Sequence, residues 1–203
     1  MKLYNSIGPN PKVVRMFMAE KGIELPKVEV DLMAGENRQG PYLAKNPSGQ
    51  SPALELDDGS VLAEITAICE YLDEKYPGGS LIGTTPEERA ETRMWVRRVD
   101  LGICEPMANG FRYSQGLKMF QNRMRCIPQA ADDLKALAQD KLQWLDGLMA
   151  GKDYICGKRF SLADILLFVF VDFFAGIKQP INPELRNIVA WHARVKARPS
   201  AAA

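Results

Sequence analysis

The chain has 203 residues, of which 46% are hydrophobic and 25% are charged, a balance typical of globular proteins that build their own core. Lysine and arginine number 26 against 25 acidic residues, and the resulting net charge of +1 argues against a nucleic-acid-binding protein. The first residues show no signal-peptide pattern, and the longest apolar run, residues 165–171, is too short to cross a bilayer. We therefore expect a cytoplasmic protein that does not engage a membrane.

The first 76 residues alternate between short strand patterns and helical patterns. In chain order the predicted elements are a strand at 2–5, a helix at 12–21, a strand at 28–30, a helical turn at 41–45, strands at 52–56 and 60–62, and a helix at 64–75. Pro11 suits the first helical position and Gly22 suits the end of that helix. The strand–helix–strand order implies a parallel pair, and the turn signal at 57–59 implies an antiparallel hairpin. Together they predict a four-stranded mixed sheet with helices on its faces.

The rest of the chain shows only helical patterns. A linker rich in proline and glycine spans 77–85, and an all-helical domain is predicted from 86 to 203. Helices are expected over 86–113, over 122–148 apart from Pro128, from Ser161 onward, and over 188–197. The apolar helix that follows Asp164 is expected to be the buried centre of this domain. The predicted class is thus an α/β domain at 1–76 followed by an all-α helical bundle.

The cysteines and the single histidine do not form a pattern that binds metal. The cysteines Cys69, Cys104, Cys126 and Cys156 include no CxxC pair, and His192 stands alone. We expect no metal and interpret the thiols as reduced, small hydrophobic side chains in helices.

The segment 46–54 carries the first functional signal. A proline that opens a strand of a thioredoxin-like sheet is commonly cis, which turns the backbone N–H and C=O of the residue before it outward. Ser51, before Pro52, would then offer these groups to an extended peptide in the manner of an added strand. Taken alone, Pro52 is explained more simply as a proline at the start of a strand.

A second signal follows at the start of the helix predicted over 64–75. Glu64 complements the helix dipole there, which explains the residue without any ligand. The functional alternative is that the free N–H groups of the helix start hold a ligand carboxylate while Glu64 holds a ligand ammonium group. The γ-glutamyl end of glutathione carries both groups.

The pattern NPxGxxPxLxxDDGxxLxExxAIxxYLxxKYP in this chain resembles the N-terminal, thioredoxin-like domain of cytosolic glutathione S-transferases. Residues 157–164 resemble the signature of that family's helical domain, in which Ser161 caps a helix and Asp164 completes the capping box. Residues 191–199 resemble the family's last helix. The active-site loop is most similar to bacterial members of the nu-class-like group.

The resemblance implies glutathione as co-substrate and assigns roles to residues in this sequence. Ser51 pairs through its backbone with the cysteinyl part, Gln50 reaches the glycyl end, and Glu64 holds the γ-glutamyl amine. Ile65 stands where the family has serine, so its backbone N–H, with Thr66, is left for the γ-glutamyl carboxylate. The implied glutathione-binding residues are Arg38, Gln50, Ser51, Pro52, Glu64, Ile65 and Thr66.

The family also implies a group that stabilises the thiolate near the end of the first strand. Tyr4, Ser6 and Asn10 are the available donors, and their simpler interpretations are core, turn and helix cap respectively. The stretch Gly8–Pro9–Asn10 resembles the loop of nu-class-like members. We therefore favour Asn10 as the catalytic residue, with Ser6 as the alternative.

The implied function is transfer of glutathione's sulfur to a small hydrophobic electrophile, as in detoxification. Met107, Phe111 and Tyr113 are candidates for the acceptor site, and the family implies a homodimer. Two alternatives stay open: a glutathione-dependent peroxidase or disulfide reductase, and a non-catalytic module of this family that binds ligands or proteins.

Overall fold

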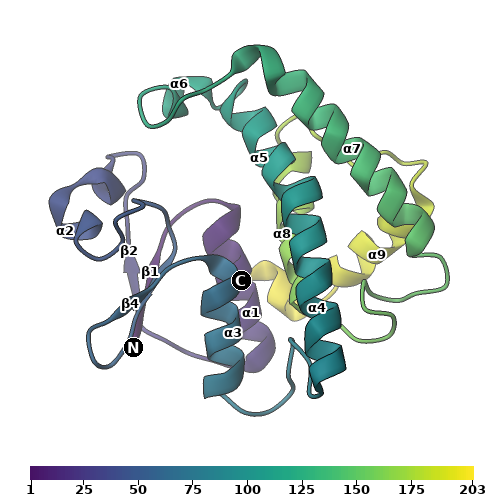
Figure 1. The fold of residues 1–203 in the computed structure, drawn as a ribbon, viewed down its shortest axis with the longest axis horizontal. Helices are drawn as coiled ribbons and strands as arrows, with labels where there is room; N and C mark the ends of the chain where they lie inside the picture. The colour runs from purple at the N-terminus through teal and green to yellow at the C-terminus, as the bar shows by residue number, and fades with distance from the viewer. The chain divides into compact units, whose positions relative to one another are not determined.

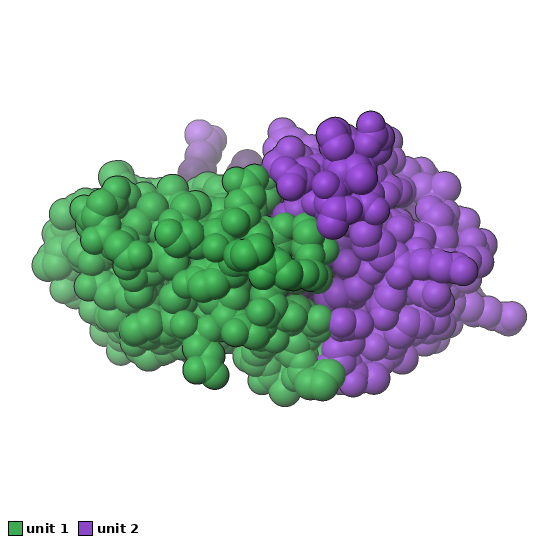
Figure 2. All heavy atoms as spheres, turned by 90° about the horizontal axis from the view of Figure 1, so that it is seen from below, with its two compact units in different colours: residues 1–81, 199–203 green, residues 82–198 purple.

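A computed structural model describes residues 1–203 and divides into two units, which Figure 2 colours separately. Residues 1–81 with 199–203 form the first, here called the sheet unit, and residues 82–198 form the second, the helical unit. The division falls within the predicted linker 77–85. Residues 199–203 were expected in the helical domain, but their turn, η4 (Pro199–Ala202), packs against the first helix and so belongs to the sheet unit.

The four strands of the sheet unit lie in the order β2-β1-β3-β4. They are β1 (Lys2–Asn5), β2 (Lys27–Glu29), β3 (Ala53–Glu55) and β4 (Val61–Leu62). β1 runs parallel to β2 and antiparallel to β3, and β3 runs antiparallel to β4. The predicted mixed sheet is confirmed, because a helical crossover sets the direction of β2 and a tight turn sets that of β4.

Helices cover both faces of this sheet. Figure 1 draws α1 (Pro9–Lys21) and α3 (Ile65–Lys75) next to each other on one side and α2 (Gly40–Leu43) on the other. Lys21 and Asp73 join α1 to α3 through a buried ion pair of 2.8 Å. On the α2 side, Tyr4, Tyr42 and Ala53 form a small apolar cluster with Val30. A short 3-10 turn, η1 (Glu36–Arg38), precedes α2.

The first helix begins earlier than the sequence suggested. Pro9, not Pro11, takes the first helical position, and Gly8 precedes it with a φ of 110°. Asn10 therefore lies inside the first turn and does not cap the helix. At the other end, Gly22 adopts the left-handed conformation, with a φ of 64°, and closes the helix as predicted.

The helical unit contains no strand, only isolated bridges within residues 154–159. Its α-helices are α4 (Pro86–Val99), α5 (Glu105–Arg112), α6 (Leu117–Phe120), α7 (Ala131–Leu148), α8 (Leu162–Ala175) and α9 (Arg186–Lys196). A π-helical segment, η2 (Asp100–Cys104), joins α4 to α5, so the predicted helix over 86–113 is a nearly continuous helical rod.

The helix predicted over 122–148 is wrong at its start. A 3-10 turn, η3 (Pro128–Ala130), leads into α7, which begins only at Ala131, and residues 122–127 are not helical. The ring of Pro128 disfavours a helical conformation of the residue before it, and Ile127 has φ −125° and ψ 77°. The helical pattern in 122–127 was therefore overridden by a single proline.

α8 is the buried centre of the helical unit, as predicted, with every residue from Leu162 to Val171 buried. It is the most apolar helix of the chain but has only 14 residues. None of the helices has the combined length and apolar character that a crossing of the bilayer requires.

The predicted capping box at the start of α8 is present, and its acid does more than cap. The Asp164 carboxylate accepts hydrogen bonds from the Ser161 N–H at 3.0 Å and the Ser161 hydroxyl at 3.1 Å. It also accepts from the Ile155 N–H and the Trp191 ring N–H, each at 2.9 Å. Asp164 is fully buried, so it fastens α8 to the preceding loop and to α9.

Candidate functional site

Strand pairing brings three segments of the sheet unit together at one end of the sheet. Tyr4 pairs with Ala53, and extending this antiparallel register by two residues sets Ser6 opposite Ser51. Leu54 pairs with Leu62, and the same extension sets Pro52 opposite Glu64. The loop after β1, the loop before β3 and the start of α3 therefore meet where the sequence placed its candidate residues.

A direct contact ties the first two segments. The Ser6 hydroxyl donates to the Ser51 hydroxyl at 2.8 Å, and Ser6 is only 3% exposed. Ser51 is half-buried, and the Ser51–Pro52 peptide is cis, as the sequence suggested. The structure thus gives Ser6 a role in joining loops, in addition to the catalytic role weighed for it.

The start of α1 presents an unusual set of donors. Pro9 and Pro11 occupy the first and third helical positions and have no N–H, so Gly8 and Asn10 supply the free N–H groups of this helix end. The Asn10 side chain is half-buried and makes no hydrogen bond within the protein. Asn10 therefore offers both a backbone and a side-chain N–H beside the positive end of the helix dipole.

Arg15 of α1 holds the loop after β1 through hydrogen bonds from its guanidinium group. It donates to the Asn5 side-chain oxygen at 2.7 Å and to the Ser6 carbonyl at 3.3 Å. The Asn5 amide in turn donates to Glu29 of β2 at 2.7 Å. Burial lowers the pKa of Arg15, and the Glu29 carboxylate opposes that shift. This network was not predicted from the sequence.

The loop before β3 is fixed by side chains from the α2 region. The carbonyl of Gln50 accepts from the Tyr42 hydroxyl at 2.6 Å and from the Asn46 amide at 2.8 Å. The Asn37 amide donates to the Gly49 carbonyl at 2.6 Å. Burial raises the pKa of Tyr42, which keeps its hydroxyl in the donating form. Asn46 belongs to the segment singled out in the sequence, but the hydrogen bonds of Tyr42, Asn46 and Asn37 were not predicted. Together they hold the backbone that carries Gln50 and Ser51.

Two predicted ligand contacts in this region are exposed side chains. Gln50 reaches solvent, and Arg38 is exposed with a long contact of 3.5 Å to the Ser48 carbonyl. Both are therefore available to a ligand. Beside them, Asn37 is 4% exposed and its side-chain oxygen has no hydrogen-bond partner.

Replacing Gly49 with alanine tests how tightly this loop is held. Gly49 has a φ of +61°, and an added methyl would lie 3.0 Å from the Asn37 carbonyl and 3.2 Å from Leu43. The left-handed backbone and the crowding together should lower the free energy of unfolding by about 2–3 kcal/mol. Gly59→Ala is the matched control, because Gly59 has a φ of +85° but open space around it. Equal losses in urea unfolding for the two variants would contradict the close packing of this loop.

Glu64, at the head of α3, has an uncommon backbone conformation. Its φ is 66° and its ψ is 119°, in a region that residues other than glycine rarely adopt. Its carbonyl accepts from the Ile68 N–H at 3.0 Å, and the N–H groups of Ile65 and Thr66 lie in the first turn without a helical partner. Such strained residues persist where the surrounding structure demands them, and they cluster at functional sites. The exposed Glu64 carboxylate thus stands beside donors suited to an anion.

Tyr4, weighed as a donor from sequence, is engaged elsewhere. Its hydroxyl donates to Glu55 at 2.7 Å, and Lys45 and Lys2 also pair with this carboxylate at 2.8 and 2.9 Å. The hydrogen bond from Lys45, followed by that from Tyr4, lowers the pKa of Glu55 to about 2. The Tyr4 hydroxyl therefore donates its hydrogen bond to Glu55 of β3, and we do not propose it as the group that stabilises a thiolate.

The three candidate acceptor residues belong to the helical unit. Met107 is fully buried in α5 and offers no surface to a substrate, so we withdraw it from the candidates. Phe111 is half-buried, with its ring centre 5.8 Å from that of Phe174 and 6.1 Å from that of Phe120. Tyr113, just beyond α5, is also half-buried. Phe111 and Tyr113 remain predictions.

Comparison with known protein families gives two matches along the chain. Residues 1–74 match the model "Glutathione S-transferase, N-terminal domain", and residues 128–194 match "Glutathione S-transferase, C-terminal domain". The first matched range contains all three segments described above.

Individual relatives agree over nearly the full length. Glutathione S-transferase 2 of Saccharomyces cerevisiae is 34% identical over 200 residues, which cover 95% of this chain and 84% of the relative. Glutathione S-transferase GstA of Escherichia coli O157:H7 is 30% identical, over 98% of this chain and 94% of the relative. The crystal structure of a glutathione S-transferase domain-containing protein from Marinobacter aquaeolei VT8 has a TM-score of 0.93 and 37% identity, covering 98% of this chain and 99% of the other.

Proposed function

Because this chain belongs to the glutathione S-transferase family, we propose that its sheet unit binds glutathione and presents the thiolate to a small hydrophobic electrophile. The observation that carries the proposal is Glu64, held at a φ of 66° at the head of α3 and set by strand register opposite Pro52. The helix dipole accounts for an acidic residue there but not for its strained backbone, whereas a ligand with adjacent ammonium and carboxylate groups would account for both.

The γ-glutamyl end of glutathione fits the start of α3. Its ammonium group pairs with the exposed Glu64 carboxylate, and its carboxylate accepts from the free N–H groups of Ile65 and Thr66. Since Ile65 has no hydroxyl, the backbone N–H and the hydroxyl of Thr66 supply the contacts at this point.

The rest of the tripeptide extends along the loop before β3. The cysteinyl part pairs with the backbone of Ser51, like an added strand, next to Pro52. The glycyl carboxylate then meets Gln50 and the guanidinium of Arg38, both of which are exposed.

Asn10 is the residue that we propose to stabilise the thiolate sulfur of glutathione. Its side-chain amide and the N–H groups of Gly8 and Asn10 favour S⁻ over SH, so the thiol releases its proton to solvent near neutral pH. The sulfur then attacks the electrophilic carbon, a C–S bond forms, and the leaving group departs with the electron pair of its broken bond. Phe111 and Tyr113 are the residues that we propose for the electrophile.

We further propose that the protein is a homodimer that works in the cytoplasm, with a role in detoxification.

The first test of glutathione binding is calorimetric titration of glutathione into the purified full-length protein. Saturable binding of one glutathione per chain at millimolar affinity or better supports the transferase. A folded protein that binds no glutathione overturns it and leaves a non-catalytic member of the family.

Glu64→Gln should raise the Kd for glutathione about tenfold, because it removes the charge that pairs with the ammonium group but keeps the size of the side chain. Glu74→Gln is the control, since Glu74 is an exposed acid in the last turn of the same helix. The same titration measures both variants. Similar affinities for wild-type protein and Glu64→Gln would show that the carboxylate does not hold the amine.

A further inference from the structure

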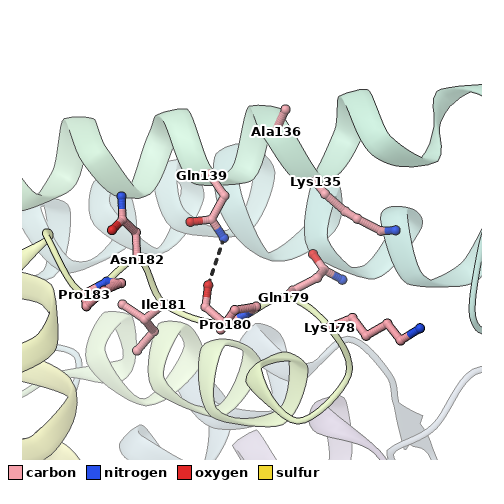
Figure 3. A pocket seen from close by; sticks show the side chains of 9 residues that line it. All are labelled: Lys135, Ala136, Gln139, Lys178, Gln179, Pro180, Ile181, Asn182 and Pro183. Carbon is pink, nitrogen blue, oxygen red and sulfur yellow. Dashed lines mark hydrogen bonds between the residues drawn. The ribbon is translucent and has the colours of Figure 1, made fainter.

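In the helical unit, a hollow of about 450 Å³ lies between α7 and residues 178–183 (Figure 3). Its polar side chains are exposed, already bonded or covered by other atoms. Lys178 is exposed, and the Gln139 amide donates to the Pro180 carbonyl at 3.4 Å. Gln179 is only 4% exposed, so its amide is not open to the hollow. This hollow therefore presents no buried polar group to a ligand, and we assign it none.

The sheet unit contains a half-buried cation, Arg15 of α1, that the proposed function has not used. It lies in the second turn of the helix between two fully buried residues, Val14 and Met16. Burial disfavours a charge, whereas an apolar side chain would pack at this position without that penalty. The contacts that the guanidinium group makes therefore explain the cation better than packing does.

Those contacts join α1 to the end of β1. One guanidinium nitrogen, Nη1, donates to the Asn5 side-chain oxygen at 2.7 Å and to the Ser6 carbonyl at 3.3 Å. Both acceptors are buried, with Asn5 7% and Ser6 3% exposed. The Asn5 amide also donates to Glu29 at 2.7 Å, which fixes the orientation of the Asn5 side chain. Arg15 thus links the second turn of α1 to the last residue of β1 and to the residue that follows it.

The loop between β1 and α1 has little packing of its own. Ile7 is 65% exposed, and a side chain added at Gly8 would meet no atom within 4 Å. The conformation of these two residues therefore depends on the two ends of the loop, which are Ser6 and the start of α1. Because Arg15 joins those ends, it also determines where the N–H groups of Gly8 and Asn10 point.

Ser6 extends the same link to the loop before β3. Its carbonyl accepts from Arg15, while its hydroxyl donates to the Ser51 hydroxyl at 2.8 Å. Ser51 is the residue proposed to pair with the backbone of the cysteinyl part of glutathione, and Asn10 is the residue proposed for its sulfur. Both halves of the cysteinyl site are therefore connected to Arg15.

We propose that Arg15 is a positioning residue for the thiolate: through Ser6 it holds the loop after β1 so that Gly8 and Asn10 donate to the sulfur while Ser51 holds the backbone of the same cysteinyl group. Arg15 itself does not touch glutathione. The inference rests on the proposed binding of glutathione by the sheet unit, and all of its residues belong to that unit.

Arg15→Met tests this role, because it keeps an unbranched apolar stem but removes every hydrogen bond of the guanidinium group. In the glutathione complex, ultraviolet absorbance of the thiolate against pH should show that the pKa of the bound thiol rises by about one unit. The Kd for glutathione should change less than about threefold, since the Gln50 carbonyl keeps its bonds with Tyr42 and Asn46. Loss of folded protein alone would not move the pKa of the thiol in the complex.

Two further variants separate charge from hydrogen bonding. Lys75→Met removes an exposed cation from the last turn of α3 and should leave the thiol pKa unchanged. Arg15→Lys keeps the charge on a shorter side chain with a single nitrogen, so it should raise the pKa by less than Arg15→Met does. If Arg15→Met does not fold, Arg15→Lys carries the same measurement, and an unchanged thiol pKa in Arg15→Lys then contradicts the role of the hydrogen bonds.

A double variant tests whether Arg15 acts through the loop. When Asn10→Ala is already present, Arg15→Met should raise the thiol pKa by less than about half as much as it does alone, because one of the donors that Arg15 positions is missing. An undiminished effect, or a thiol pKa in Arg15→Met equal to that of the wild-type complex, overturns the inference and leaves the proposed function intact. A wild-type protein that binds no glutathione overturns both.

Discussion

Asp164→Ala is expected to lower the free energy of unfolding by about 3–5 kcal/mol, because it leaves buried donors without an acceptor. Four hydrogen bonds end on this carboxylate, from two groups of Ser161, from the Ile155 N–H and from the Trp191 ring. Ile155 and Ser161 are themselves buried, so their N–H groups would lose their acceptor inside the protein. Urea or thermal unfolding followed by circular dichroism measures the loss.

Asp140→Ala is the matched control for this experiment. Asp140 is an exposed acid on α7, and its removal should change stability by no more than about 0.5 kcal/mol. If both variants unfold at the same midpoint, the Asp164 carboxylate does not hold α8, α9 and the loop at Ile155 together.

The same residue makes stability depend on pH in a direction unusual for an acid. Burial raises the pKa of Asp164 to about 6, although its hydrogen bonds with Ile155, Trp191 and Ser161 oppose the shift. The folded protein thus binds this proton more tightly than the unfolded chain does. The stability that Asp164 contributes is full below about pH 4 and falls by about 3 kcal/mol as the pH rises through 6. Asp164→Asn should remove this dependence, which unfolding at pH 4 and pH 7 measures.

Asn10→Ala is expected to reduce the turnover of an electrophile by glutathione about 10- to 100-fold. A hydrogen bond to a charged sulfur is among the stronger ones, and its loss raises the pKa of the bound thiol by about 1–2 units. The thiolate's ultraviolet absorbance, followed against pH in the glutathione complex, measures that shift directly. The affinity for glutathione should change little, because the tripeptide keeps its contacts with Gln50, Ser51 and Glu64.

Ser6→Ala is the informative comparison, because Ser6 was the alternative donor. Its hydroxyl is buried against Ser51, so its loss should cost a modest amount of stability and leave most of the turnover. Should Ser6→Ala abolish turnover while Asn10→Ala leaves it intact, Ser6 is the residue that stabilises the sulfur.

Local signals with a strict physical cause predicted the fold well. Gly22 ended α1, the turn at 57–59 set the hairpin, and Ser161 with Asp164 fixed the start of α8. The predicted start of α1 was wrong, because two neighbouring prolines can each occupy the first position of a helix. Two prolines stand near the start of α1, and the pattern alone did not show which of them begins the helix.

The site was predicted less completely than the fold. Ser51, Pro52 and Glu64 stand in recognisable patterns, so the sequence could propose them as ligand-binding residues, and their contacts with glutathione stay predictions. Arg15, Asn37 and Tyr42 act through hydrogen bonds to loops 8–12 residues away in the sequence, and no sequence pattern predicts such contacts. The positive φ of Glu64 had no signal in the sequence, because residues other than glycine, asparagine and aspartate rarely adopt that conformation.

The return of residues 199–203 to the sheet unit affects how this unit is made in the cell. η4 packs against α1, and the Ser200 hydroxyl bonds to Glu20, but more than half of the chain lies between these partners. On the ribosome, residues 1–81 emerge and begin to fold well before 199–203 have been synthesised. The surface of α1 that contacts η4 therefore stays exposed until residues 199–203 have been synthesised. If translation is stalled before residue 199, proteases should cut the nascent sheet unit more readily than they cut the same unit in the full-length protein.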